Sequence, residues 1–183
     1  YLGPHIHTSL RPSYEVTRRI HKAWDNYSDF GKVLRSPRTP WRVKSTLFRA
    51  LCHGALSTGL DPLAIGPTEE HRLDVAQVSL GRRTMGKTGQ GYTDPWGKWV
   101  GPSADTVRTY NRSPSVGPVL RYRRLVWFYG IVSRRDHRVL AALLGKGAWE
   151  PSPPLEDGIP TDKAPAWLHV IHADLSWAIH EWQ

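Results

Sequence analysis

The chain between residues 13 and 34 reads SYEVTRRIHKAWDNYSDFGKVL, and this stretch predicts a long amphipathic helix. Ser13 is a residue type that caps the N-terminus of helices. Apolar side chains recur at steps of three and four residues, at Val16, Ile20, Ala23, Trp24, Tyr27 and Phe30. The basic residues Arg18, Arg19 and Lys22 fall mostly off that stripe. We therefore expect this helix to have one buried face and one basic face.

Two further helices are predicted downstream. The segment from Trp41 to Thr58 has a helical pattern, and its expected buried side comprises Val43, Leu47, Ala50, Leu51 and Ala55. Its basic residues are expected to face outward, and they are Arg42, Lys44 and Arg49. The next helix is expected to start with Thr68 as its cap and to end near Gly86, with a core stripe of Leu73, Ala76 and Leu80.

The rest of the chain divides into loops and shorter helices. Residues 86–118 are rich in Gly, Pro, Thr and Ser and are expected to form a long loop insertion. Residues 1–12 suit an edge strand or hairpin, since Pro4 cannot donate a ladder hydrogen bond. The remaining predicted segments are helices near 119–132 and 137–144, a Pro-rich linker at 147–165 and a C-terminal helix at 166–183. The expected fold class is mainly α, a helical bundle with a small N-terminal β-strand or hairpin and long irregular loops.

The composition favours a polyanionic partner. Lys and Arg number 25 against 16 acidic residues, which gives a formal net charge of +9. A basic excess of this size is typical of nucleic-acid-binding proteins. The single cysteine, Cys52, excludes an internal disulfide and favours a reducing, intracellular compartment. We find neither a signal peptide nor an apolar run long enough to span a bilayer, so no membrane partner is expected.

One motif suggests a different function. Residues 81–88 read GRRTMGKT, which fits the P-loop pattern letter for letter. A nucleotide-binding P-loop requires a strand before the loop and a helix after it, whereas the segment before Gly81 has a helical pattern. A P-loop nucleotide-binding protein using Gly86, Lys87 and Thr88 therefore remains as an alternative interpretation.

Catalytic and metal-binding patterns are sparse. The chain has no adjacent aspartate pair, and two-metal phosphoryl transfer needs clustered carboxylates. His169 and His172 are three residues apart without an acidic residue between them, so we predict no metal site and no catalytic residue in this chain.

Basic clusters with interleaved aromatic residues are the strongest chemical signal. Residues 121–127 read RYRRLVW, which combines cations for phosphates with rings for stacking. Trp127 is expected to lie in the core. Together with the clusters on two other predicted helices, this segment suggests that one groove is lined by basic helices. The candidate phosphate contacts are Arg18, Arg19, Lys22, Arg42, Lys44, Arg82, Arg83, Arg121, Arg123 and Arg124.

The same segments resemble, in order, the region that follows the catalytic core of non-LTR retrotransposon reverse transcriptases. Tyr1, Leu2 and Gly3 are similar to a stretch of that family's primer grip, and WRVKSTLFRA at 41–50 to a helix of its thumb. RRTMG at 82–86 and RRLVWFYGIV at 123–132 resemble two further motifs. The chain departs from the family pattern at 56–61, where a tyrosine is missing, and at 123–132, where a histidine is missing.

The resemblance implies a fragment of an RNA-directed DNA polymerase. It makes residues 1–12 a primer-grip-like strand and 13–146 a thumb-like region that holds an RNA and DNA template–primer by its backbone. The family's catalytic aspartates would precede Tyr1, so magnesium is expected only in the intact polymerase. The chain begins at Tyr1 and its one methionine is Met85, so we expect a longer polypeptide, acting in the nucleus. The last alternative is an inactive remnant of a retroelement.

Overall fold

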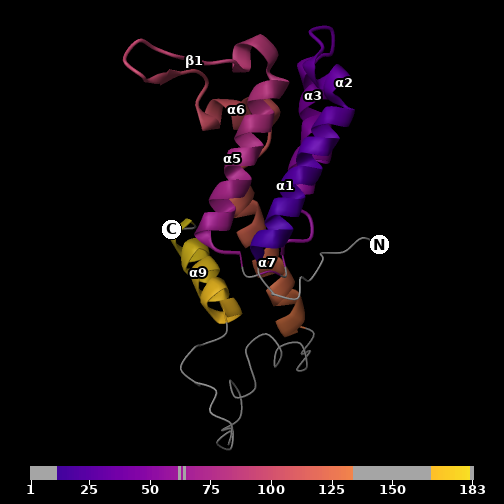
Figure 1. The fold of residues 1–183 in the computed structure, drawn as a ribbon. Helices are drawn as coiled ribbons and strands as arrows, with labels where there is room; N and C mark the ends of the chain where they lie inside the picture. The colour runs from indigo at the N-terminus through magenta and orange to yellow at the C-terminus, as the bar shows by residue number, and fades with distance from the viewer. Residues whose placement is uncertain (1–11, 62, 64, 134–165, 182–183) are drawn as a thin grey trace, which may run out of the picture. The chain divides into compact units, whose positions relative to one another are not determined.

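The computed structural model describes residues 12–61, 63, 65–133 and 166–181. It confirms that the protein is mainly helical (Figure 1). The chain divides into two compact units, one from residues 1–60 and 67–120 and the other from residues 61–66 and 121–183. The predicted N-terminal strand, the short helix at 137–144 and the linker at 147–165 lie outside the described residues. Among the described residues, no helix is long and apolar enough to cross a membrane.

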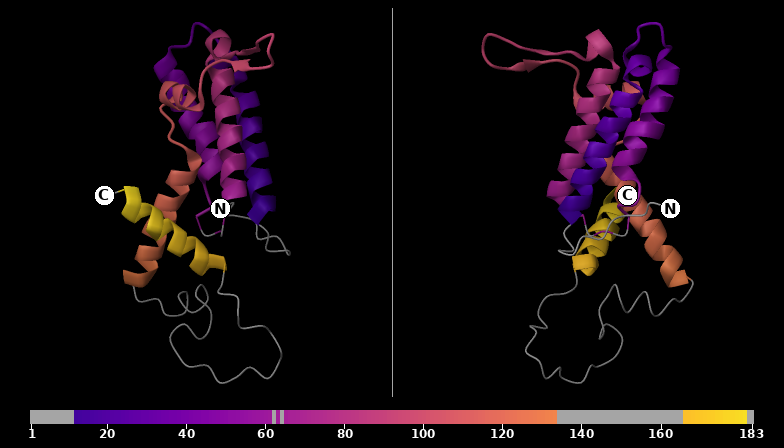
Figure 2. Two further views of the ribbon diagram at one scale, coloured as in Figure 1. Left: turned by 90° about the vertical axis from the view of Figure 1, so that its left-hand side faces the viewer. Right: turned by 45° about the vertical axis from the view of Figure 1, so that its right-hand side comes forward.

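The first unit is built around two long helices that lie side by side (Figure 2). Helix α1 (Pro12–Asp29) packs against α5 (Pro67–Thr84) and against the helical segment after Trp41. The predicted stripe is buried at Val16, Ala23 and Tyr27, but the helix ends before Phe30, which is 42% exposed. A separate short helix, α2 (Gly31–Arg35), follows. Helix α5 buries the predicted stripe of Leu73, Ala76 and Leu80.

The second predicted helix forms, but its buried face was predicted wrongly. It consists of α3 (Trp41–Leu47), a π-helical segment η1 (Phe48–His53) and α4 (Gly54–Ser57). The buried stripe is Phe48, Cys52 and Leu56 at steps of four, while Val43 is 45% exposed. These larger side chains fix the rotation of the helix and turn Lys44 inward. Burial raises the pKa of the Cys52 thiol to about 12, so Cys52 is protonated and shielded at neutral pH.

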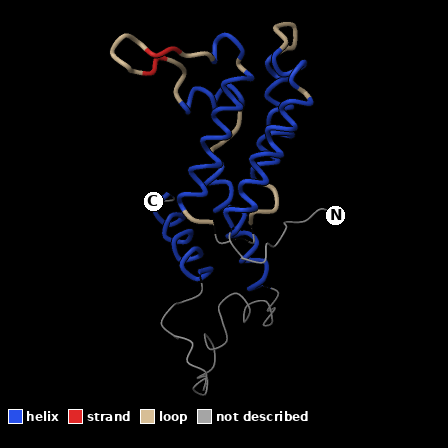
Figure 3. The backbone as a smooth tube through the Cα atoms, in the orientation of Figure 1, coloured by secondary structure: helices blue, strands red, loops and turns tan. Residues whose placement is uncertain are grey.

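Residues 86–118 are more ordered than the sequence suggested. They contain a 3-10 turn η2 (Gly86–Gly89), a hairpin of β1 (Tyr92–Thr93) and β2 (Trp99–Val100), and helix α6 (Ala104–Asn111). The antiparallel register pairs Tyr92 with Val100, and the two strands are drawn in red in Figure 3. The prediction of a long loop was wrong because Ser103 caps α6 by accepting a hydrogen bond from the Thr106 N–H at 3.1 Å.

Helix α7 (Val116–Ser133) begins three residues before the predicted start. Its first N–H group, from Val116, donates to the Asp74 carboxylate at 2.9 Å. The Ser115 hydroxyl donates to the same carboxylate at 2.8 Å. Asp74 lies far from Ser115 and Val116 in the sequence, so the local sequence could not reveal these hydrogen bonds. The C-terminal helix α9 (Ala166–Glu181) lies within the predicted range.

Candidate nucleic-acid interface

A pocket with a volume of about 620 Å³ lies in the first unit. Basic side chains reach it from four elements, with Arg35 on α2, Lys44 on α3, Arg82 and Arg83 on α5, and Lys87 on η2. Neither aspartate nor glutamate occurs among the lining residues of this described pocket. The lining therefore carries five formal positive charges and no negative ones, which makes it a site for anions.

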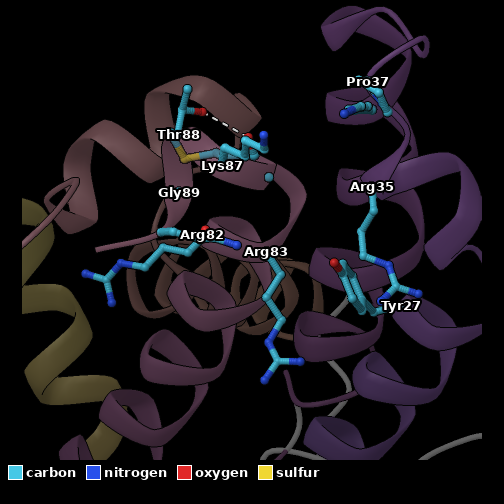
Figure 4. Close-up of a pocket in the computed structure, with 12 residues that line it drawn as sticks. Tyr27, Arg35, Pro37, Arg82, Arg83, Lys87, Thr88 and Gly89 are labelled. Carbon is cyan, nitrogen blue, oxygen red and sulfur yellow. Dashed lines mark hydrogen bonds between the residues drawn. The ribbon is translucent and has the colours of Figure 1, made fainter. Parts of the chain in front are cut away.

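Figure 4 shows how the labelled side chains lie in this pocket. The Tyr27 ring lies beside Arg35, and Tyr27 lines the pocket with its hydroxyl oxygen buried. The Arg82 guanidinium points away from Tyr27, and its Nη2 donates to the Pro102 carbonyl at 3.2 Å. The Arg83 guanidinium stacks over the Trp24 ring, 4.7 Å from its centroid. Arg82 thus contributes less to the centre of the pocket than the other cations.

Lys44 was expected to face solvent, and this expectation was wrong. Its residue is only 6% exposed, and it lines the pocket from the buried side of α3. In the part of the chain that the structure describes, its ammonium group has no ion-pair partner. Lys44 is therefore the least exposed of the five cations that line the pocket.

The basic cluster on α1 is partly neutralised. Glu15 is 2% exposed and accepts hydrogen bonds from Arg18 at 2.7 Å and from Arg19 at 2.8 Å. Burial raises the pKa of Glu15, but the hydrogen bonds and charges of the two arginines outweigh burial and lower it overall. One acidic and two basic groups leave a single positive charge. Lys22 is exposed on the same helix, and Arg42 is exposed on α3.

Three predicted contacts lie in the second unit, and one of them is corrected. Arg124 is 1% exposed and donates to both carboxylate oxygens of Asp174 on α9, at 2.7 and 3.0 Å. A buried, bidentate ion pair of this kind leaves no surface for a phosphate, so Arg124 is not a phosphate contact. Arg121 lies over the Trp177 ring at 5.9 Å, while Arg123 is exposed.

Arg123 and Arg124 also act on a buried carboxyl group in the second unit. Burial, the largest effect, raises the pKa of Asp61, and the two arginines lower it only in part. The neighbouring Trp127 is half-buried rather than fully in the core. On this part of α7, Arg121 and Arg124 therefore make contacts inside the protein, while Arg123 is exposed.

The structure brings together three of the ten predicted contacts, Lys44, Arg82 and Arg83, in one pocket. It does not place the other seven along that pocket. The sequence analysis missed Arg35 and the hydroxyl of Tyr27, and it considered Lys87 only as part of a P-loop. Arg35 lay at the end of the predicted first helix, where only tertiary packing could bring it opposite η2. The primer-grip candidates Tyr1, Leu2 and Gly3 lie outside the described residues.

The P-loop interpretation does not fit the local backbone. Gly81 lies inside α5, where a Cβ atom would meet the Val107 and Asn111 side chains. Gly86 has a positive φ of 64° directly after that helix, a conformation typical of helix ends. A helix precedes the motif and a four-residue turn follows it, so the strand–loop–helix arrangement of a P-loop is missing here.

Neither a search for metal-binding clusters nor the comparisons with known proteins assigns a function to the chain. The described residues contain no cluster of three or more His, Cys, Asp or Glu side chains that could hold a metal ion. Comparisons with protein-family models, curated proteins and solved structures gave no match to this chain.

Proposed function

We propose that this chain binds the sugar–phosphate backbone of nucleic acid as part of a retroelement reverse transcriptase. The carrying observation is the pocket of the first unit, whose described lining contains Arg35, Lys44, Arg82, Arg83 and Lys87 and no carboxylate. Folding normally disperses cations, because like charges repel. Keeping five of them around one pocket is favourable when a polyanion occupies it.

The charge of the whole chain supports the same partner. The net charge of +9 attracts nucleic acid from a distance, and each neutralised phosphate releases a counterion. Exposed Lys22 and Arg42 add cations outside the pocket on α1 and α3. Such contacts position a duplex by its backbone and do not read bases.

The order of the sequence motifs supports the more specific part of the proposal. The resemblance makes this region a primer grip and thumb, which hold an RNA and DNA template–primer. The resemblance does not extend to the parts of that family that carry out polymerisation and bind magnesium. For the chain itself, the proposed activity is binding.

Binding of a labelled RNA–DNA hybrid, measured by fluorescence anisotropy over a series of salt concentrations, tests the proposal. The logarithm of affinity should fall linearly with the logarithm of salt concentration. The triple variant Lys44→Met, Arg83→Met and Lys87→Met should reduce that slope by about one for each lost phosphate contact.

The matched control replaces three exposed cations of the first unit outside the pocket, namely Lys32→Met, Arg38→Met and Arg49→Met. This control removes the same amount of charge, but from outside the pocket. If the pocket is the binding site, the control should therefore weaken binding much less than the first triple variant. An equal loss in both triple variants would show that net charge alone acts. Absence of any binding by the unmodified chain would rule the proposal out. Protection of Cys52 from thiol reagents reports that each variant is folded.

A further inference from the structure

The lining of the cationic pocket includes a buried hydroxyl group that has no hydrogen-bond partner among the described residues. Tyr27 is 4% exposed, and its hydroxyl has no hydrogen-bond partner among the described residues. Burial raises the pKa of Tyr27, although Arg35 and Arg83 lower it in part. The phenol is therefore protonated at neutral pH and can donate. Buried hydroxyl groups are rarely left without a partner unless water or a ligand provides one.

Lys44 is a second, independent observation in the same pocket. Its side chain is turned inward and is 6% exposed, with no acidic residue among the pocket lining. An anion with several oxygen atoms would accept from the Tyr27 hydroxyl and neutralise Lys44 at once. Phosphate groups have this combination of charge and acceptors.

The depth of the two groups indicates which kind of phosphate fits. An internal phosphodiester is attached to sugars on both sides, so in a duplex it stays at the protein surface. A terminal phosphate monoester is attached on one side only and can enter a pocket. It carries up to two charges at neutral pH, which suits a lining of Arg35, Lys44, Arg83 and Lys87.

We propose that this pocket binds the terminal phosphate monoester of a nucleic-acid strand, an inference that rests on the proposed function. Tyr27 donates to a phosphate oxygen, and Lys44 supplies the deepest positive charge. Arg35, Arg83 and Lys87 come from α2, α5 and η2 and surround the remaining oxygens. The pocket thereby recognises the end of a strand, while the exposed cations outside it contact internal phosphates.

The test compares one RNA–DNA hybrid in three forms, with hydroxyl groups at all ends, with a 5′-phosphate or with a 3′-phosphate. The full chain is titrated by anisotropy at about 150 mM salt, where weak surface contacts are screened. At least one phosphorylated form should bind about tenfold more tightly than the hydroxyl form. Tyr27→Phe should reduce this preference several-fold, and Lys44→Met should abolish it.

Two matched controls separate the pocket from general effects. Tyr14→Phe removes a phenol hydroxyl from a residue of α1 that is 51% exposed, and Lys32→Met removes an exposed cation of α2. Both should keep the preference for phosphorylated ends. Because Tyr27→Phe removes only the hydroxyl group, it also remains informative if Lys44→Met fails to fold.

The possible outcomes distinguish the two proposals. Equal affinity for all three hybrids would overturn the strand-end inference and leave backbone binding intact. Competition by inorganic pyrophosphate against the phosphorylated form alone would support the pocket as the site of that preference. If the chain bound pyrophosphate but none of the hybrids, the pocket would not bind the phosphate of a strand end. The proposed binding of nucleic acid would then be wrong as well.

Discussion

Arginine serves opposite purposes in the two units of this protein. In the second unit, Arg124 is 1% exposed and is paired with the carboxylate of Asp174. In the first unit, Arg35, Arg83 and three other cations surround a pocket without any carboxylate. The ion pair of Arg124 and Asp174 in the second unit is electrically neutral and buried. The pocket of the first unit is positively charged and can accept an anion.

The comparison teaches that a basic cluster in sequence does not by itself define a binding site. Arg121, Arg123 and Arg124 form the densest basic cluster considered, yet its last member is buried in an internal ion pair. The five basic residues that line the pocket come from four elements, and among these five only Arg82 and Arg83 are adjacent in sequence. The carboxylates nearby decide whether a cation is structural or available to a ligand.

The largest expected effect is the loss of the buried ion pair. Asp174→Ala leaves Arg124 charged and buried without its partner, which should cost about 3–5 kcal/mol of unfolding free energy. Urea unfolding of the full chain measures this cost. Asp105→Ala is the control, because Asp105 is 91% exposed in its ion pair with Arg108 and should cost less than about 1 kcal/mol. Similar costs for both variants would contradict the structural role of Arg124.

The next effect concerns the cations of the pocket. Arg83→Met combined with Lys87→Met should weaken hybrid binding by about tenfold to thirtyfold, or about 1.4–2 kcal/mol. Their unfolding free energy should change little, since both residues are exposed. Asp174→Ala should give the opposite pattern: its unfolding free energy should fall, while its affinity for the hybrid, measured where the variant is still folded, should change little. If the pocket variant lost stability but kept its affinity for the hybrid, the pocket cations would have a structural role and the contrast between the two units would be wrong.

A smaller effect is expected at Glu15. Its carboxylate neutralises part of the basic cluster on α1, so this cluster is intermediate between the neutral ion pair of Arg124 and the positively charged pocket. Glu15→Gln removes the charge that holds Arg18 and Arg19 and should cost about 1–2 kcal/mol. Because the folded-state pKa is lowered, this stability is present above the ordinary pKa of 4.5 and is lost as pH falls through the folded-state value. Urea unfolding between neutral and acid pH should show a smaller acid loss in the variant than in the unmodified chain.

The smallest effect is expected from the exposed cations outside the pocket. Lys22→Met and Arg42→Met should each change stability by less than about 0.5 kcal/mol. Each should lower hybrid affinity by about twofold to threefold and should leave the preference for phosphorylated ends unchanged. A tenfold loss from either variant would move the main binding surface away from the pocket.

The elements with strong local signals were predictable from the sequence. The first turn of α5 with Glu69 and Glu70, and its buried Leu73 and Leu80, agree with the pattern of acidic and apolar residues, although α5 begins at Pro67 and Thr68 is therefore not its cap. The helical face of α3 was not predictable, because Val43 and Phe48 lie on competing faces and burial of the larger ring prevailed. Helix α6 was missed because Gly and Pro residues dominate the segment around it.

The sequence by itself determined that the chain is helical and strongly basic, since periodicity and charge are properties of neighbouring residues. Only the tertiary structure decided which cations share a pocket and which are neutralised, because Lys44, Arg83 and Tyr27 come from separate helices. Electrostatic energy depends on distance in space and on burial, and neither quantity is written in the order of residues. For that reason Arg83 and Arg124 look alike in the chain and have different roles in the fold.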